Sequence, residues 1–147
     1  MKYFTSEWWR AANEEDTTAE KYREFYSSIE AQLPTAIRRL EDEHTLHDAR
    51  LLKILSDFSN QSLTLILNGW DQGFNEEVLY KLTFTGVVEN SLTIPENEDD
   101  SAPELSDLGY WEHDTLDTAF QLRALFASGA VLTVTYHGFE FSHEIQV

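Results

Sequence analysis

The 147-residue sequence contains no cysteine. This absence excludes disulfide bonds, thiolate catalysis and metal sites with cysteine ligands. The six glycines are scattered at positions 69, 73, 86, 109, 129 and 138 and form no phosphate-binding loop. The G-x-S-x-G, S-x-x-K and H-E-x-x-H motifs of hydrolases are missing as well. A non-enzymatic role is therefore the first expectation.

Long apolar runs are also missing. No window approaches the ~18 apolar residues of a membrane-spanning helix. Residues 1–15 have no continuous apolar core and no cleavage site of the kind found in secretory signals. The sequence therefore predicts a cytoplasmic protein that does not enter a membrane.

Basic residues are scarce, with 10 Lys and Arg against 27 Asp and Glu, for a net charge of −17. Residues 1–48 hold six basic and eleven acidic residues, whereas residues 49–147 hold four and sixteen. A field of this sign repels nucleic acid and anionic lipid, so neither is an expected partner. It favours a basic protein or a cation, and it also simply keeps a protein soluble.

Aromatic residues are plentiful, at 13% of the chain, and the first third places them at helical spacing. Residues 6–13 and 16–33 read as helices, the second with a capping box from Thr17 to Glu20. Pro34 interrupts the pattern, and residues 34–44 continue it with Ile37 and Leu40 on one face. Two or three N-terminal helices are expected.

The remainder alternates with a period of two, which indicates strands. Residues 49–57 fit a helix or a strand. The turn residues 59–62 and the alternation of Leu63, Leu65 and Leu67 favour a hairpin. Residues 95–107 read as an acidic loop. Residues 118–147, with turns at 128–129 and 137–138, predict a three-stranded meander.

These patterns predict an α+β protein. Its two or three helices precede an antiparallel β-sandwich or strongly bent sheet of about six to eight strands. The boundary falls between a helical segment at 1–46 and a β-domain at 47–147. The edge of a last strand ending at Val147 offers a surface to a second copy of the chain, which makes a homodimer one expected assembly.

Three histidine or aromatic groups are candidates for chemistry or binding. His44, His47 and Asp48 offer two imidazoles and a carboxylate to a divalent metal, with His143 as a further ligand, although Asp48 can equally cap the helix–strand junction. Around His113, Glu112 and Asp114 share one face of a strand and the histidine takes the other, so the triplet alone is no catalytic cluster. Trp70 and Trp111 stand beside acids on loops, as in glycan sites and protein hot spots, or cover the end of a small β-domain.

The function expected from these features is that of an acidic interaction protein, immunity-like or regulatory, for a basic protein partner. Trp70 and Trp111 are the expected anchors, and the acidic surface supplies charge through Asp99, Asp100, Glu104, Asp107 and Glu112. Two alternatives stay open. The first is a metal-binding domain or metal-dependent hydrolase that uses His44, His47 and Asp48. The second is a glycan-binding module that uses Trp70 and Trp111.

The chain also resembles an uncharacterised family of small bacterial cytoplasmic proteins. The residues that carry the resemblance are Met1-Lys2-Tyr3-Phe4-Thr5, Glu7-Trp8, Leu46-His47-Asp48-Ala49, Leu82-x-Phe84-x-Gly86-Val87, Tyr110-x-Glu112, Leu125-Phe126-x-x-Gly129 and Leu132-x-Val134. They span most of the chain. The resemblance implies a helical N-terminal part on a C-terminal β-domain, and it implies no active site.

Overall fold

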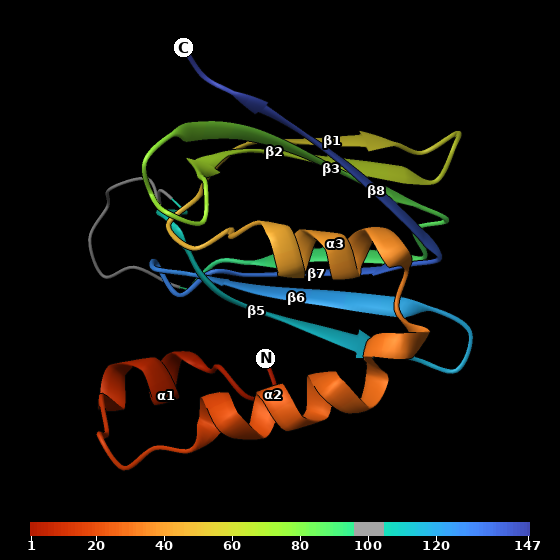
Figure 1. Ribbon diagram of the computed structural model, residues 1–147. Coiled ribbons are helices and arrows are strands. Elements are labelled where there is room, and N and C mark those ends of the chain that lie inside the picture. The colour runs from red at the N-terminus through yellow and green to blue at the C-terminus, as the bar shows by residue number, and fades with distance from the viewer. Residues whose placement is uncertain (96–104) are drawn as a thin grey trace.

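The computed structural model describes residues 1–95 and 105–147, in which helices come first and strands follow (Figure 1). The helices are α1 (Ser6–Ala11), α2 (Thr18–Ile29), the short 3-10 helix η1 (Glu30–Gln32) and α3 (Thr35–Glu43). The strands are β1 (Arg50–Asp57), β2 (Ser62–Trp70), β3 (Glu77–Thr85), β4 (Glu89–Thr93), β5 (Leu108–Thr115), β6 (Phe120–Phe126), β7 (Val131–Tyr136) and β8 (Gly138–Ile145). The predicted α+β class is confirmed. No helix in this part of the chain is long and apolar enough to cross a membrane.

The strands form two antiparallel sheets. Within the described residues, the first sheet has the order β1-β2-β3-β8 and the second has the order β4-β7-β6-β5. The two sheets share one hydrophobic core and form an open sandwich. The prediction of a sandwich with six to eight strands is therefore confirmed.

The chain crosses from one sheet to the other at two connections that lie side by side, β3 to β4 and β7 to β8. Gly86 lies between β3 and β4 and has a φ of +57°, a left-handed conformation that glycine adopts without strain. His137 lies between β7 and β8. Its ring Nδ1 donates to the Gly86 carbonyl at 2.8 Å, and its backbone N–H donates to the Thr85 carbonyl at 3.0 Å. The two crossings therefore hold each other in place.

The predicted C-terminal meander is wrong in its third strand. β6 pairs with β7, but β8 crosses over and pairs with β3 of the first sheet. Phe139 of β8 lies against Phe84 of β3, with ring centroids 5.1 Å apart, and 6.3 Å from the ring of Tyr136. Alternation marks a segment as a strand, but it does not say which neighbour the strand takes. Burial of Phe139 between the sheets decides the pairing.

Residues 49–57, whose pattern fits a helix or a strand, contain the strand β1, as the predicted hairpin requires. It pairs with β2 from Arg50 opposite Asn68 to Asp57 opposite Ser62, with a bulge at Leu52. β1 is an edge strand, and both Leu52 and Leu55 are about half exposed. The bulge shifts the alternation by one residue, and neither face of the strand is fully buried. Its apolar pattern therefore fits neither period cleanly.

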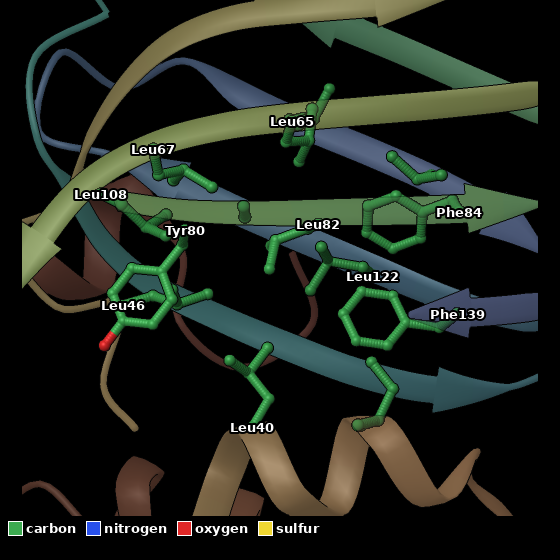
Figure 2. Close-up of a cluster of buried hydrophobic side chains, with 14 of the residues drawn as sticks. Leu40, Leu46, Leu65, Leu67, Tyr80, Leu82, Phe84, Leu108, Leu122 and Phe139 are labelled. Atoms are coloured by element: carbon green, nitrogen blue, oxygen red, sulfur yellow. The ribbon is translucent and has the colours of Figure 1, made fainter. Parts of the chain in front are cut away.

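Helix α3 fills the open side of the sandwich, between β8 and β5 (Figure 1). Pro34 stands just before its first residue, where the missing N–H costs no hydrogen bond. Ile37 and Leu40 are buried, and Leu40 points from the helix toward the strands (Figure 2). The helix and both sheets therefore share the core, whose members include Ile37, Leu40, Leu65, Leu82, Phe84, Leu122, Val134 and Tyr136.

Candidate functional site

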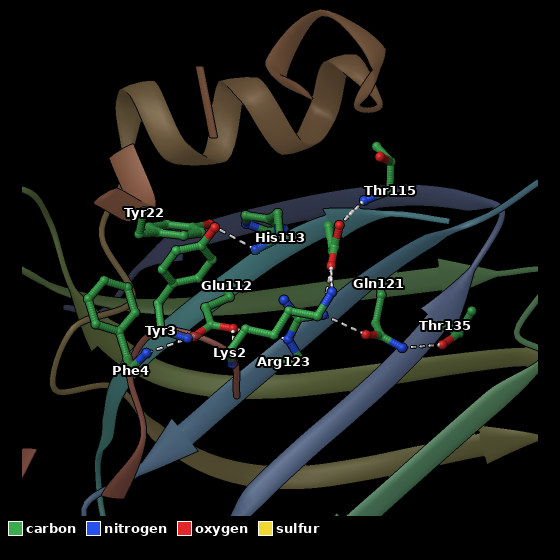
Figure 3. A network of polar contacts seen from close by, with 11 residues as sticks. Lys2, Tyr3, Phe4, Tyr22, Glu112, His113, Thr115, Gln121, Arg123 and Thr135 are labelled. Carbon is green, nitrogen blue, oxygen red and sulfur yellow. Dashed lines mark hydrogen bonds and ion pairs between the residues drawn. The ribbon is translucent and has the colours of Figure 1, made fainter. Parts of the chain in front are cut away.

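Glu112 of β5 is a carboxylate with 0% exposure, covered by the start of the chain (Figure 3). Its Oε1 accepts hydrogen bonds from the backbone N–H groups of Tyr3 and Phe4, at 2.7 and 2.8 Å. Its Oε2 accepts from the backbone N–H of Lys2 at 2.9 Å and from Arg123 Nε at 3.0 Å. Four donors replace the water that burial removes. Through them, the sheet holds residues 2–4 in place.

Asp114 lies two residues further along the same face of β5. Its Oδ2 accepts from Lys2 Nζ at 2.9 Å and from Arg123 Nη1 at 3.1 Å. Arg123 Nη1 also donates to Gln121 Oε1 at 2.7 Å. Two negative and two positive groups therefore compensate each other beneath the N-terminal segment. We call this group the β5–β6 ion network, consisting of Lys2, Glu112, Asp114 and Arg123.

The β5–β6 ion network makes the stability of the fold depend on pH. Burial alone would raise the pKa of Glu112, but the N–H groups of Lys2, Phe4 and Tyr3 and the Arg123 side chain outweigh it and lower that pKa. The pKa of Asp114 is lowered against the same opposition from burial, by Lys2 and Arg123. A carboxyl with a lowered folded-state pKa stabilises the fold fully above its unfolded pKa of about 4. This contribution is lost as the pH falls through the folded-state pKa.

We therefore expect the free energy of unfolding to fall as the pH drops below about 5. The slope of the unfolding free energy against pH should be smaller in the variant E112Q, because glutamine cannot release or take up a proton at this site. Urea unfolding followed by far-UV circular dichroism at a series of pH values measures both slopes. Equal slopes for the wild type and E112Q would show that Glu112 does not contribute to the pH dependence of stability.

The opposite face of β5 carries His113, as the alternation predicts. The His113 ring is buried, and its Nε2 donates to Glu41 Oε1 of α3 at 2.9 Å. The Trp111 indole N–H donates to the same oxygen at 2.6 Å. The backbone N–H of His113 donates to the Tyr22 hydroxyl of α2 at 2.8 Å. Because β5 is an edge strand, Tyr22 occupies a backbone donor that another strand would otherwise use.

A cavity of about 420 Å³ lies between α2 and β5. Helix α2 provides one wall through positions three and four residues apart, which share a face of a helix. The beginning of β5 provides the facing wall, and among the residues that the structure describes Glu41 is the only acid in the lining. We call this cavity the α2–β5 pocket, lined by Phe4, Ala19, Tyr22, Arg23, Tyr26, Glu41, His47, Gly109, Tyr110 and Trp111. Its volume lies within the range of small-molecule sites.

The structure brings His44 and His143 of the predicted metal site together, whereas His47 and Asp48 lie in other surroundings. His44 Nδ1 lies 3.2 Å from the Tyr80 hydroxyl, and its ring centroid lies 4.5 Å from that of His143. Burial, and then His143, lower the pKa of His44. His47 Nδ1 donates to the Gly109 carbonyl at 3.0 Å, and its Nε2 lies 3.6 Å from Asp48 Oδ1. Across residues 1–95 and 105–147, no three His, Asp or Glu side chains are arranged to hold a metal ion.

The predicted partner-binding residues are also dispersed. Glu112 is the clear correction, because its buried carboxylate is taken up by the N-terminal segment and Arg123 and is closed to a partner. Trp111 is half-buried and lines the α2–β5 pocket, whereas Trp70 is exposed at the end of β2 and does not line it. Asp107 is exposed beside β5. The other three acids, Asp99, Asp100 and Glu104, lie outside the described residues.

Several residues of the ion network and the pocket were not among the predicted ones, and they include Lys2, Tyr26, Glu41 and Arg123. Arg123 left a signal in the sequence, because it is the first Lys or Arg after Lys81 and stands within an alternating apolar strand. A lone charge in such a strand indicates a buried ionic partner. Lys2, Tyr26 and Glu41 left no comparable signal. Each reaches its place through contacts between segments that are distant in sequence.

The fold and the pocket define a small α+β protein with an open antiparallel sandwich and an aromatic cavity beside its N-terminal helices. The chain belongs to the family described as "Protein of unknown function (DUF4085)", whose model matches residues 1–138. The resemblance to an uncharacterised family is thereby confirmed.

No curated protein matches the chain. A solved structure, "Crystal structure of an uncharacterized protein from Neisseria gonorrhoeae", is similar to it with a TM-score of 0.48 and 14% sequence identity. The similarity covers 67% of this chain and 93% of that one. The family description gives no function.

Proposed function

We propose that this protein is a non-enzymatic binding protein of the cytoplasm whose partner is a basic protein. The observation that carries the proposal is a pair of exposed aromatic side chains among acids, where β2 turns into β3. Trp70 is 36% exposed and Phe74 is 47% exposed. We call this region the hairpin-tip surface, consisting of Trp70, Asp71, Phe74, Glu76 and Glu77 with Asp42 and Glu43 at the end of α3.

The loop that presents Phe74 is ordered by its own hydrogen bonds. Asp71 Oδ1 accepts from the backbone N–H groups of Asn75 and Glu76, at 2.6 and 3.0 Å. The N–H groups of Glu76 and Asn75 lower the pKa of Asp71 and so keep its charge in place. The backbone N–H of Phe74 donates to the Asp71 carbonyl at 3.0 Å. An aromatic side chain on such a preformed loop loses little conformational entropy when a partner binds.

The acids of the surface come from two segments that are joined to each other. The Gln72 side chain donates to the Asp42 carbonyl at 3.0 Å, which ties the β2–β3 loop to the end of α3. Asp42 and Glu43 are exposed there, and Glu76 and Glu77 are exposed on the hairpin. Aromatic anchors within a field of one sign suit a partner that brings positive charge and an apolar contact.

Two alanine substitutions test the surface. We expect W70A/F74A to weaken the binding of a basic protein by at least about tenfold, as the loss of aromatic hot-spot residues does. Raising the salt concentration from 0.1 to 1 M shortens the screening length from about 10 to about 3 Å and should weaken the wild-type complex as well. Pull-down from the source cell, followed by titration calorimetry with the captured protein, measures both effects.

The control is F58A, because Phe58 is 88% exposed on the β1–β2 turn, away from the hairpin-tip surface. This variant should bind as the wild type does. A partner whose affinity is indifferent to salt, or is lowered equally by F58A and by W70A/F74A, would refute the proposal.

A further inference from the structure

We propose that the α2–β5 pocket binds an organic cation with an alkylammonium head group. The pocket contains none of the residues of the hairpin-tip surface. The inference therefore stands apart from the proposed function and goes beyond it.

The walls of the pocket form a nearly continuous aromatic surface. The Phe4 ring stacks on Tyr110, with centroids 5.1 Å apart, and meets Tyr22 at 5.2 Å. Tyr22 in turn lies 6.3 Å from Tyr26. The indole of Trp111 lines the same cavity. The faces of such rings carry negative potential, and cages built from them bind ammonium groups in water.

Glu41 adds a fixed negative charge to this aromatic surface. Its Oε1 is held by the Trp111 indole N–H at 2.6 Å and by His113 Nε2 at 2.9 Å. These two donors fix the orientation of the carboxylate. Its Oε2 accepts no hydrogen bond from the residues that the structure describes, and the side chain is 23% exposed. This second oxygen is therefore available to a positively charged ligand.

Tyr26 is a lining residue of the pocket whose hydroxyl is turned into the protein. This hydroxyl is buried and has no hydrogen-bond partner among residues 1–95 and 105–147. Burial, and then the charge of Glu41, raise the pKa of Tyr26, so the hydroxyl stays protonated and neutral. Tyr26 therefore adds an uncharged aromatic ring to the pocket wall and no competing charge.

Two basic residues of the lining point to a competing ligand class. Arg23 and His47 are both exposed, and a carboxylate or phosphate ligand would bind to them rather than to Glu41. A long arginine side chain can extend its charge into water, whereas Glu41 is fixed by Trp111 and His113. The structure therefore favours a cation, and anion binding becomes an outcome that the experiment can report.

Choline and its neutral carbon isostere, 3,3-dimethylbutan-1-ol, test the inference because they differ in charge and hardly in shape. Each is titrated into the full chain while the indole N–H signal of Trp111 is followed by nuclear magnetic resonance, with W111F used to assign that signal. We expect choline to shift the signal and to bind at least about tenfold more tightly than the alcohol, as a partly desolvated cation–π site does.

Variants separate the pocket from the general acidity of the protein. E41Q keeps the shape and the acceptor oxygen but removes the charge, and it should reduce the preference for choline to what the aromatic rings alone provide. E24Q removes the same charge from an exposed position of α2 and should leave the preference intact. R23A should bind choline at least as tightly as the wild type does. Thermal unfolding of each variant confirms that it is folded.

A lysine-containing peptide distinguishes the two sources of an alkylammonium group. Tighter binding of N-acetyl-lysine methylamide than of choline indicates a protein side chain, and the reverse order indicates a free small molecule; both support the inference. Equal affinity for choline and its isostere, no binding of any ammonium probe, equal losses in E41Q and E24Q, or preferential binding of acetate or phosphate that R23A abolishes would each overturn it.

Discussion

Replacing Glu112 by glutamine is expected to lower the free energy of unfolding by about 3–5 kcal/mol, the cost of breaking a buried ion pair from one side. The amide can still accept hydrogen bonds through its oxygen. Its NH₂ group, however, replaces an acceptor of the Arg123 guanidinium with a donor. Arg123 is 5% exposed and, within residues 1–95 and 105–147, would then keep only Asp114 as a charged partner. Urea unfolding at pH 7 measures the loss.

E140Q is the matched control, because Glu140 is exposed on β8 and its replacement should change stability by no more than about 0.5 kcal/mol. In the double variant E112Q/R123M, the loss should be smaller than the sum of the two single losses, by about 1–3 kcal/mol. Additive losses would show that Glu112 and Arg123 are not coupled, and a loss in E112Q no larger than in E140Q would exclude a buried network.

The second large effect is expected at helix α3. Ile37 is only 1% exposed, and the variant I37A should lose about 2–5 kcal/mol of unfolding free energy through lost burial and the cavity left behind. The reason is that α3 occupies the open side of the sandwich, so its apolar face belongs to the same core as both sheets. Denaturant unfolding monitored by tryptophan fluorescence provides the measurement.

The control for this variant is L55A on the exposed edge strand β1, where Leu55 is 52% exposed. Its loss should be well below that of I37A, because a half-exposed side chain leaves no closed cavity. If I37A is as stable as L55A, or if it unfolds in two separate transitions, α3 is not part of the sandwich core.

Local patterns were enough to predict most elements of this fold, but not the short strand β4. The spacing of Tyr22, Phe25 and Tyr26 identifies α2. The leucines that alternate in the sequence of β2 are the buried residues of that strand in the structure. Alternation also places Glu112 and His113 on opposite faces of β5 correctly. These are properties of a few neighbouring residues, and such residues determine the period of an element.

Long-range contacts explain what the sequence did not reveal. The backbone of Lys2 binds Glu112 across a separation of 110 residues, and no local pattern records that contact. Glu112 therefore looked like a surface charge in a strongly acidic stretch, although it is fully buried. The crossing of β8 to the first sheet has the same origin, since it depends on where Phe139 finds Phe84 and Tyr136. The α2–β5 pocket likewise combines four separate segments of the chain.

One buried carboxylate thus connects the fold with the pocket. Glu112 holds the backbone of residues 2–4, and the same Phe4 whose N–H it binds contributes its ring to the pocket wall. The opposite face of β5 supplies Trp111 and His113 to orient Glu41. Disruption of the ion network should therefore loosen the pocket as well as destabilise the protein.

Hydrogen exchange at the backbone amides of Tyr3 and Phe4 measures this connection directly, because both N–H groups end on Glu112. In the wild type, we expect these two amides to exchange much more slowly than in an unstructured peptide. In E112Q, they should exchange faster, while the amides of β2 and β3 in the core stay protected. Exchange of Tyr3 and Phe4 at the unstructured rate in the wild type, or exchange unchanged by E112Q, would contradict the role assigned to Glu112.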